Sequence, residues 1–82
     1  PLTEKQWIQM EDSFSLVESV ETGMSGQIQL LRRPVEKGKK LGWAFVEEPK
    51  KGERVIRPFK SEIEARALIK DRLAAYERMW DG

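Results

Sequence analysis

A segment near the C-terminus most limits what this chain can fold into. The residues after Ser61 contain neither glycine nor proline until Gly82. Ser61 and Glu64 have the spacing of a capping box, in which both side chains bind the unpaired backbone N–H groups at a helix start. We therefore predict a long helix over residues 61–80, against which the rest of the domain packs.

One side of this predicted helix is apolar when each residue is turned by about 100° from the one before it. That side consists of Ala65, Leu68, Ile69, Leu73, Ala75, Tyr76, Met79 and Trp80. Arg72 falls within it, and an unpaired guanidinium would be costly there. We expect Arg72 to lie at a gap in the contact, to extend outward, or to pair with Glu47 or Glu48. The apolar side is predicted to cover a sheet.

The middle of the chain has the alternation and the turn residues of antiparallel strands. Residues 14–20 and 27–33 alternate on either side of a turn with two glycines, which predicts a first hairpin. Residues 42–48 and 53–57 flank a Pro-Lys-Lys-Gly turn and predict a second hairpin. In the first strand, alternation places three apolar residues on one side: Phe14, Leu16 and Val20.

A second capping box, formed by Thr3 and Gln6, predicts a short helix near the N-terminus. Its apolar face is formed by Trp7, Met10 and Phe14. The chain of 82 residues is therefore predicted to be one α+β domain. A short helical segment (1–12) precedes one antiparallel sheet of about four strands (13–60), which the C-terminal helix (61–80) covers.

The residue inventory favours a binding function over catalysis. The chain contains no cysteine and no histidine, so thiolate ligands, imidazole ligands and the commonest general base are missing. We predict a non-enzymatic protein without a catalytic residue, metal or cofactor. No apolar stretch is long enough to span a membrane and none resembles a signal sequence, so an intracellular location is expected, in the cytoplasm, nucleoid or nucleus.

Positive charge is concentrated in the middle of the chain although the net charge is only +1. Residues 1–31 carry one basic and five acidic residues, whereas residues 32–60 carry ten basic and four acidic residues. Lys and Arg can neutralise phosphates, and an exposed tryptophan can stack on a base. The candidate nucleic-acid contacts are Arg32, Arg33, Lys39, Lys40, Trp43, Lys50, Lys51, Arg54 and Arg57. The alternative is that these cations solvate exposed turns and that Trp43 and Phe45 belong to the core.

Several short motifs in residues 32–76 resemble known DNA-binding domains. They are Arg32-Arg33-Pro34, Gly42-Trp43-Ala44, Pro49-Lys50-Lys51-Gly52-Glu53-Arg54-Val55, Phe59-Lys60-Ser61 and Glu64-Ala65. This stretch resembles the ethylene-response-factor domain of plants and is similar to the arm-type domain of phage and transposon integrases. Both families present a three-stranded antiparallel sheet, backed by a C-terminal helix, to the major groove. The resemblance implies DNA contacts by Arg32, Arg33, Trp43 and Arg54, and a helix held to the sheet near Phe59 and Ala65.

Two functions are therefore expected. The leading one is a nucleic-acid-binding module, for DNA, that uses the basic sheet and turns of residues 32–60. The alternative is a small protein-interaction adaptor or regulatory protein that binds through an open sheet face or an edge strand. The position of Trp43 separates the two functions. Exposure beside the arginines favours nucleic acid, whereas burial of Trp43 together with an exposed apolar edge favours a protein partner.

Overall fold

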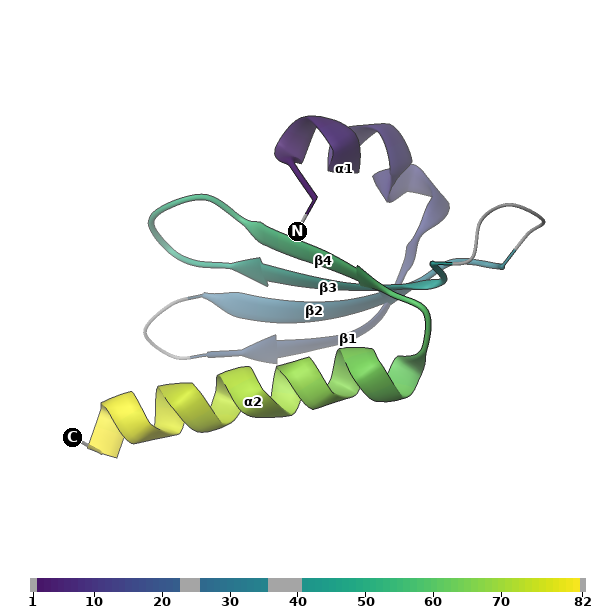
Figure 1. Cartoon of the computed structure of the whole chain (residues 1–82). Helices are drawn as coiled ribbons and strands as arrows, with labels where there is room; N and C mark the ends of the chain where they lie inside the picture. The colour runs from purple at the N-terminus through teal and green to yellow at the C-terminus, as the bar shows by residue number, and fades with distance from the viewer. Residues whose placement is uncertain (1, 23–25, 36–40, 82) are drawn as a thin grey trace.

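The fold is described by a computed structural model that covers residues 2–22, 26–35 and 41–81. Its elements are α1 (Glu4–Met10), a 3-10 turn (Glu11–Ser13), β1 (Ser15–Glu21), β2 (Gln27–Arg32), β3 (Trp43–Glu48), β4 (Val55–Phe59) and α2 (Glu62–Asp81). The strands form one antiparallel sheet in the order β1-β2-β3-β4 (Figure 1). The predicted α+β class, with a short N-terminal and a long C-terminal helix, is confirmed.

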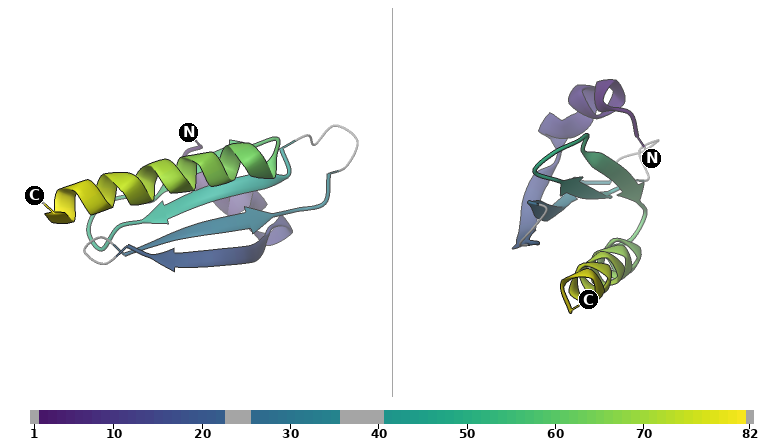
Figure 2. Two further views of the ribbon diagram at one scale, coloured as in Figure 1. Left: turned by 90° about the horizontal axis from the view of Figure 1, so that it is seen from below. Right: turned by 90° about the vertical axis from the view of Figure 1, so that its left-hand side faces the viewer.

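The two helices lie on opposite faces of the sheet (Figures 1 and 2). Beneath α2, the buried core consists of Ile28, Leu30, Phe45, Ala65 and Ile69. On the α1 face, the buried core consists of Trp7, Phe14, Ala44, Val46 and Ile56. Because α2 packs mainly against β2, β3 and β4, the strand β1 lies at the margin of both cores.

Local hydrogen bonds explain why each helix begins where it does. The Thr3 hydroxyl accepts a hydrogen bond from the Gln6 backbone at 3.2 Å, and the Gln6 side chain accepts one from the Thr3 backbone at 3.1 Å. The Ser61 hydroxyl accepts a hydrogen bond from the backbone of Glu64 at 3.3 Å, which satisfies one of the donors left unpaired at the start of α2. The helix starts at Thr3 and Ser61 are thus confirmed.

The apolar side of α2 covers the sheet as predicted over most of its length. Arg72 adopts the paired alternative, because its Nε lies 3.0 Å from Oε1 of Glu47. Tyr76 donates a hydrogen bond to the same carboxylate. Met79 was expected on the buried side but is 67% exposed, because the last turns of α2 extend past the ends of the strands (Figure 1). The side chain of Trp80 lies outside the described residues.

A β-bulge changes the predicted alternation of β1. The register shifts between Leu16 and Glu18, so that Leu16 pairs with Leu31 whereas Val20 pairs with Ile28. Leu31 packs against the core beneath α1, and Ile28 belongs to the core beneath α2. The prediction that Phe14, Leu16 and Val20 share one side is therefore wrong for Val20, because the extra residue in the bulge reverses the alternation after it.

The two edges of the sheet differ in what lies beside them. The Leu2 backbone donates a hydrogen bond to the Ile56 carbonyl at 2.9 Å, so this carbonyl points away from β3. Pro58 is two residues further along β4 and has the same orientation, so its missing N–H removes no bond to β3. Within the described residues no strand pairs with the outer side of β1.

Candidate functional site

Arg54, predicted to contact nucleic acid, is bound by carboxylates of this chain. Its Nε and Nη2 lie 2.6 and 2.7 Å from the two carboxylate oxygens of Glu4, and its Nη1 lies 3.5 Å from Glu48. Glu11 lies at 4.0 Å. The hydrogen bonds with Glu4 raise the pKa of Arg54 and lower the pKa of Glu4. The guanidinium therefore holds the start of α1 to the β3–β4 turn.

Arg33 and Arg32 point to opposite faces of the sheet. Arg33 is buried, donates a hydrogen bond from Nε to the Leu41 carbonyl at 2.8 Å, and stacks over the Phe14 ring at 4.8 Å. Arg32 is exposed and lies 5.7 Å from the Trp43 ring centre. Trp43 is half-buried and packs against the core beneath α2. Arg32 is thus exposed while Trp43 is largely part of the core.

The other predicted cations do not gather around Arg32. Lys50 and Lys51 are exposed in the β3–β4 turn, at the far end of β3 from Trp43. Arg57 is exposed and lines a groove of about 290 Å³ between β4 and α2. Lys39 and Lys40 lie outside the described residues. The described candidates are therefore distributed over both faces and both ends of the sheet.

The sheet face opposite α2 is the face that the resemblance implies for DNA. In this chain α1 covers that face over β3 and β4. Trp7 is only 2% exposed and lies 5.1 Å from the Phe14 ring. Binding through this part of the sheet would require α1 to leave, which would expose the apolar side chains of Val46 and Ile56.

The edge strand β1 presents backbone and apolar surface together. Every residue of β1 except Val20 is exposed, and Leu16 and Val17 are 56% and 46% exposed. The Thr22 backbone donates to the Gly26 carbonyl at 2.9 Å. Because the direction of the backbone N–H alternates along a strand, Val20 also bonds toward β2, whereas Ser19 and Glu21 direct their N–H and C=O groups outward. An added strand could pair with these groups.

A groove beside α2 adjoins β1 on one face of the sheet. It has a volume of about 420 Å³ and is lined by Arg66, Ile69, Lys70, Leu73, Ala74 and Glu77. Arg66 joins it to β1, since its Nη1 lies 3.1 Å from the Glu18 carboxylate. Hydrogen bonds with Glu62 and Glu18 raise the pKa of Arg66. The α2 flank beside β1 thus has an apolar floor between charged rims.

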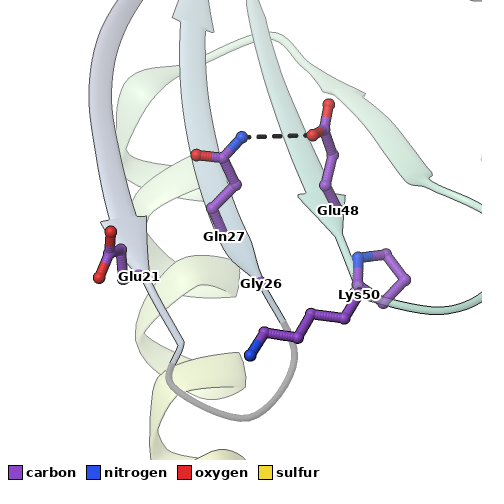
Figure 3. Close-up of a pocket in the computed structure, with 6 residues that line it drawn as sticks. Glu21, Gly26, Gln27, Glu48 and Lys50 are labelled. Atoms are coloured by element: carbon purple, nitrogen blue, oxygen red, sulfur yellow. Dashed lines mark hydrogen bonds between the residues drawn. The ribbon is translucent and has the colours of Figure 1, made fainter.

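A second pocket adjoins the end of β1 on the opposite face (Figure 3). It has a volume of about 500 Å³ and is lined by Glu21, Gly26, Gln27, Glu48, Pro49 and Lys50. Polar side chains cross the strands here: Ser19 donates to Gln27, and Gln27 donates to Glu48, both at 3.2 Å. Figure 3 shows the Lys50 side chain reaching toward the β1–β2 hairpin. The pocket thus combines two carboxylates, an amide and the ammonium group of Lys50 beside the exposed edge.

Sequence reasoning did not single out β1 as a binding element. One available signal was that residues 15–21 contain no lysine, proline or glycine, the residues that usually limit pairing at an edge strand. In the described part of the chain, no group of acidic side chains is arranged to hold a metal ion, and no helix is long and apolar enough to cross a membrane. Comparison with protein-family models, with curated proteins and with solved structures finds no significant match to this chain.

Proposed function

We propose that the chain is a non-enzymatic protein-interaction module, which takes an extended segment of a partner protein as an additional strand beside β1. The supporting observation is the contrast between the edges, because Leu2 pairs with β4 whereas Ser19 and Glu21 direct backbone groups of β1 outward. Backbone hydrogen bonds give affinity in strand addition, and side chains on alternate positions give specificity.

The predicted contacts support nucleic-acid binding less well than the β1 edge supports protein binding. Arg54 is engaged with Glu4, and Arg33 is buried against Phe14. Trp43 packs into the core while the apolar residues of β1 are exposed, which is the arrangement expected for a protein partner. Nucleic-acid binding through the exposed cations stays a prediction, which the same experiment tests.

The test uses extended peptides selected from a displayed library on the purified chain. Ser19→Pro removes an outward N–H, whereas Ser19→Ala keeps it, and neither change removes a backbone bond to β2. We expect the selected peptides to bind the original chain and Ser19→Ala, and to lose binding to Ser19→Pro. Circular dichroism should show the same fold in all three.

Two results would overturn the proposal. The first is that no peptide is selected, or that the selected peptides bind Ser19→Pro as well as Ser19→Ala. The second would come from titrating the chain with duplex DNA and with RNA at several salt concentrations. Binding that weakens linearly with the logarithm of salt, and that Ser19→Pro leaves unchanged, would favour the nucleic-acid function.

A further inference from the structure

The two faces beside β1 differ in chemistry, and this difference specifies the partner segment. We infer that the segment is an amphipathic strand, with apolar side chains toward α2 and Lys or Arg side chains toward the opposite face. The inference rests on the proposed function and names the class of partner for the same site. Alternate side chains of a strand point to opposite faces, so one segment meets both requirements.

On the α2 face, an added strand would lie about 4.8 Å outside β1, beside the flank of α2. Its side chains on this face would meet Glu18 and Val20 from the sheet and the groove above them. The groove floor is formed by Ile69, Leu73 and Ala74. Apolar side chains would remove this floor from water, whereas a charged side chain would lose hydration there. This face therefore selects apolar residues.

On the opposite face, the added strand would meet a mostly polar surface with an exposed carboxylate at the end of β1. On this face β1 carries Leu16 near its start and Glu21 at its end, and no lysine or arginine. Glu21 is exposed at the end of β1, and Glu48 lies across the pocket in Figure 3. Arg54 binds Glu48 from the α1 side and Lys50 lines the same pocket, so the attraction for an incoming cation comes from Glu21. Charge complementarity therefore favours Lys or Arg side chains here.

A second copy of this chain fits the same edge less well. In an antiparallel pairing of β1 with itself, each copy presents the same residues to the other. Both strands would then bring Glu18 and Glu21 to the interface, and neither would bring a lysine or arginine from β1. A segment of another protein that carries basic residues would therefore complement the negative charge of β1, whereas a second copy would add the same negative charge to it.

The first test compares two synthetic peptides of the same composition, each seven residues long like β1. In one, valine and lysine alternate, and in the other the valines and lysines form two blocks. Fluorescence anisotropy measures their binding to the purified chain. We expect the alternating peptide to bind about tenfold more tightly, because only it directs all valines to one face, and to weaken as salt is added.

The second test changes each face separately and uses matched controls. Ala74→Glu places a charge in the groove, whereas Ala67→Glu places the same charge on the exposed side of α2. Glu21→Gln removes the acid beside β1, whereas Glu53→Gln removes an exposed acid from the β3–β4 turn. We expect Ala74→Glu to weaken the alternating peptide about tenfold and Glu21→Gln about two- to fivefold, with little change in either control.

The possible results show whether the inference alone fails or whether the proposed function on which it rests fails with it. Equal binding of the two peptides, with binding still lost in Ser19→Pro, would leave strand addition in place and overturn the amphipathic partner. Equal effects of Ala74→Glu and Ala67→Glu would also overturn it. If neither synthetic nor library-selected peptides bind, both proposals fail. Concentration-dependent dimers in light scattering that Ser19→Pro abolishes would make a second copy the occupant and overturn the inference.

Discussion

The outer strands β4 and β1 belong to one sheet but have different surroundings. Ile56 in β4 is fully buried, and its carbonyl accepts a hydrogen bond from Leu2. On β1, Leu16 is more than half exposed, and only Val20 is partly buried. Both helices pack over the β2–β4 part of the sheet, and neither core includes a residue of β1.

This difference suggests that the β4 side of the sheet provides stability, whereas the β1 side is the part that we propose to bind a partner. Free sheet edges favour unwanted pairing, and proteins commonly limit it with proline, covering segments or charge. β4 has the first two of these features in Pro58 and Leu2, whereas β1 has only its bulge and the charges of Glu18 and Glu21. We therefore expect changes near β4 to unfold the chain and changes on β1 to affect binding.

The largest expected effect is at Trp7, which joins α1 to the β4 side of the sheet. Trp7→Ala should lower the free energy of unfolding by about 3–5 kcal/mol, because it removes a fully buried aromatic side chain. Ile8→Ala is the matched control, since Ile8 is 59% exposed on the same helix, and should change stability by about 0.5 kcal/mol or less. Urea unfolding followed by circular dichroism measures both. Similar losses in the two variants would show that α1 does not hold the β4 side.

A direct comparison of the edges uses one substitution on each. Ile56→Ala in β4 should cost about 2–5 kcal/mol, because the side chain is fully buried between α1 and the sheet. Leu16→Ala in β1 should cost about 0.5 kcal/mol or less, because the side chain already faces solvent. The same unfolding measurement checks both values. A large loss for Leu16→Ala would mean that β1 is covered in solution.

Features set by neighbouring residues were predictable from the sequence. Both helix starts depend on a side chain three residues from its partner, as with Ser61 and Glu64. The core side of α2 follows from helical periodicity, and the ion pair of Arg72 with Glu47 was among the alternatives that this periodicity raised. The helix starts and the core side of α2 are determined by spacings along the chain, whereas the partner of Arg72 is 25 residues away and was only one of several alternatives.

Features set by long-range pairing were not predictable in the same way. The bulge at Val17 depends on the register with β2, and alternation alone gives no sign of it. Arg54 was interpreted as a nucleic-acid contact because it lies among cations, but its partner Glu4 is 50 residues away. The candidate site was missed for the same reason. Whether 15–21 forms an edge or a central strand depends on strand order, which a single sequence does not specify.

A smaller effect is expected when the ion pair between Arg54 and Glu4 is titrated with acid. The pKa of Glu4 is lowered in the folded chain, mainly by its hydrogen bonds with Arg54. A carboxyl group of this kind adds stability above its ordinary pKa and loses it as the pH falls through the lowered value. Glu4→Gln and Arg54→Gln should each reduce the loss of stability below pH 4.5, the ordinary pKa of the group.

The double variant tests whether these two residues act as a pair. If they do, Glu4→Gln combined with Arg54→Gln should change the acid dependence no more than either substitution alone. Urea unfolding across a series of acidic pH values measures all four proteins. Additive effects of the two substitutions would show that Arg54 does not hold α1 through Glu4.

The smallest expected effect concerns hydrogen exchange along β1. The amides of Val20 and Glu18 point toward β2 and should exchange slowly, whereas those of Ser19 and Glu21 point outward and should exchange quickly. Amide exchange followed by NMR at low protein concentration separates neighbouring residues. Adding the alternating valine–lysine peptide should slow Ser19 and Glu21 while leaving Val20 almost unchanged, because only outward amides gain a partner. Slow exchange of Ser19 without peptide, and faster exchange on dilution, would show that another copy of the chain already occupies the β1 edge.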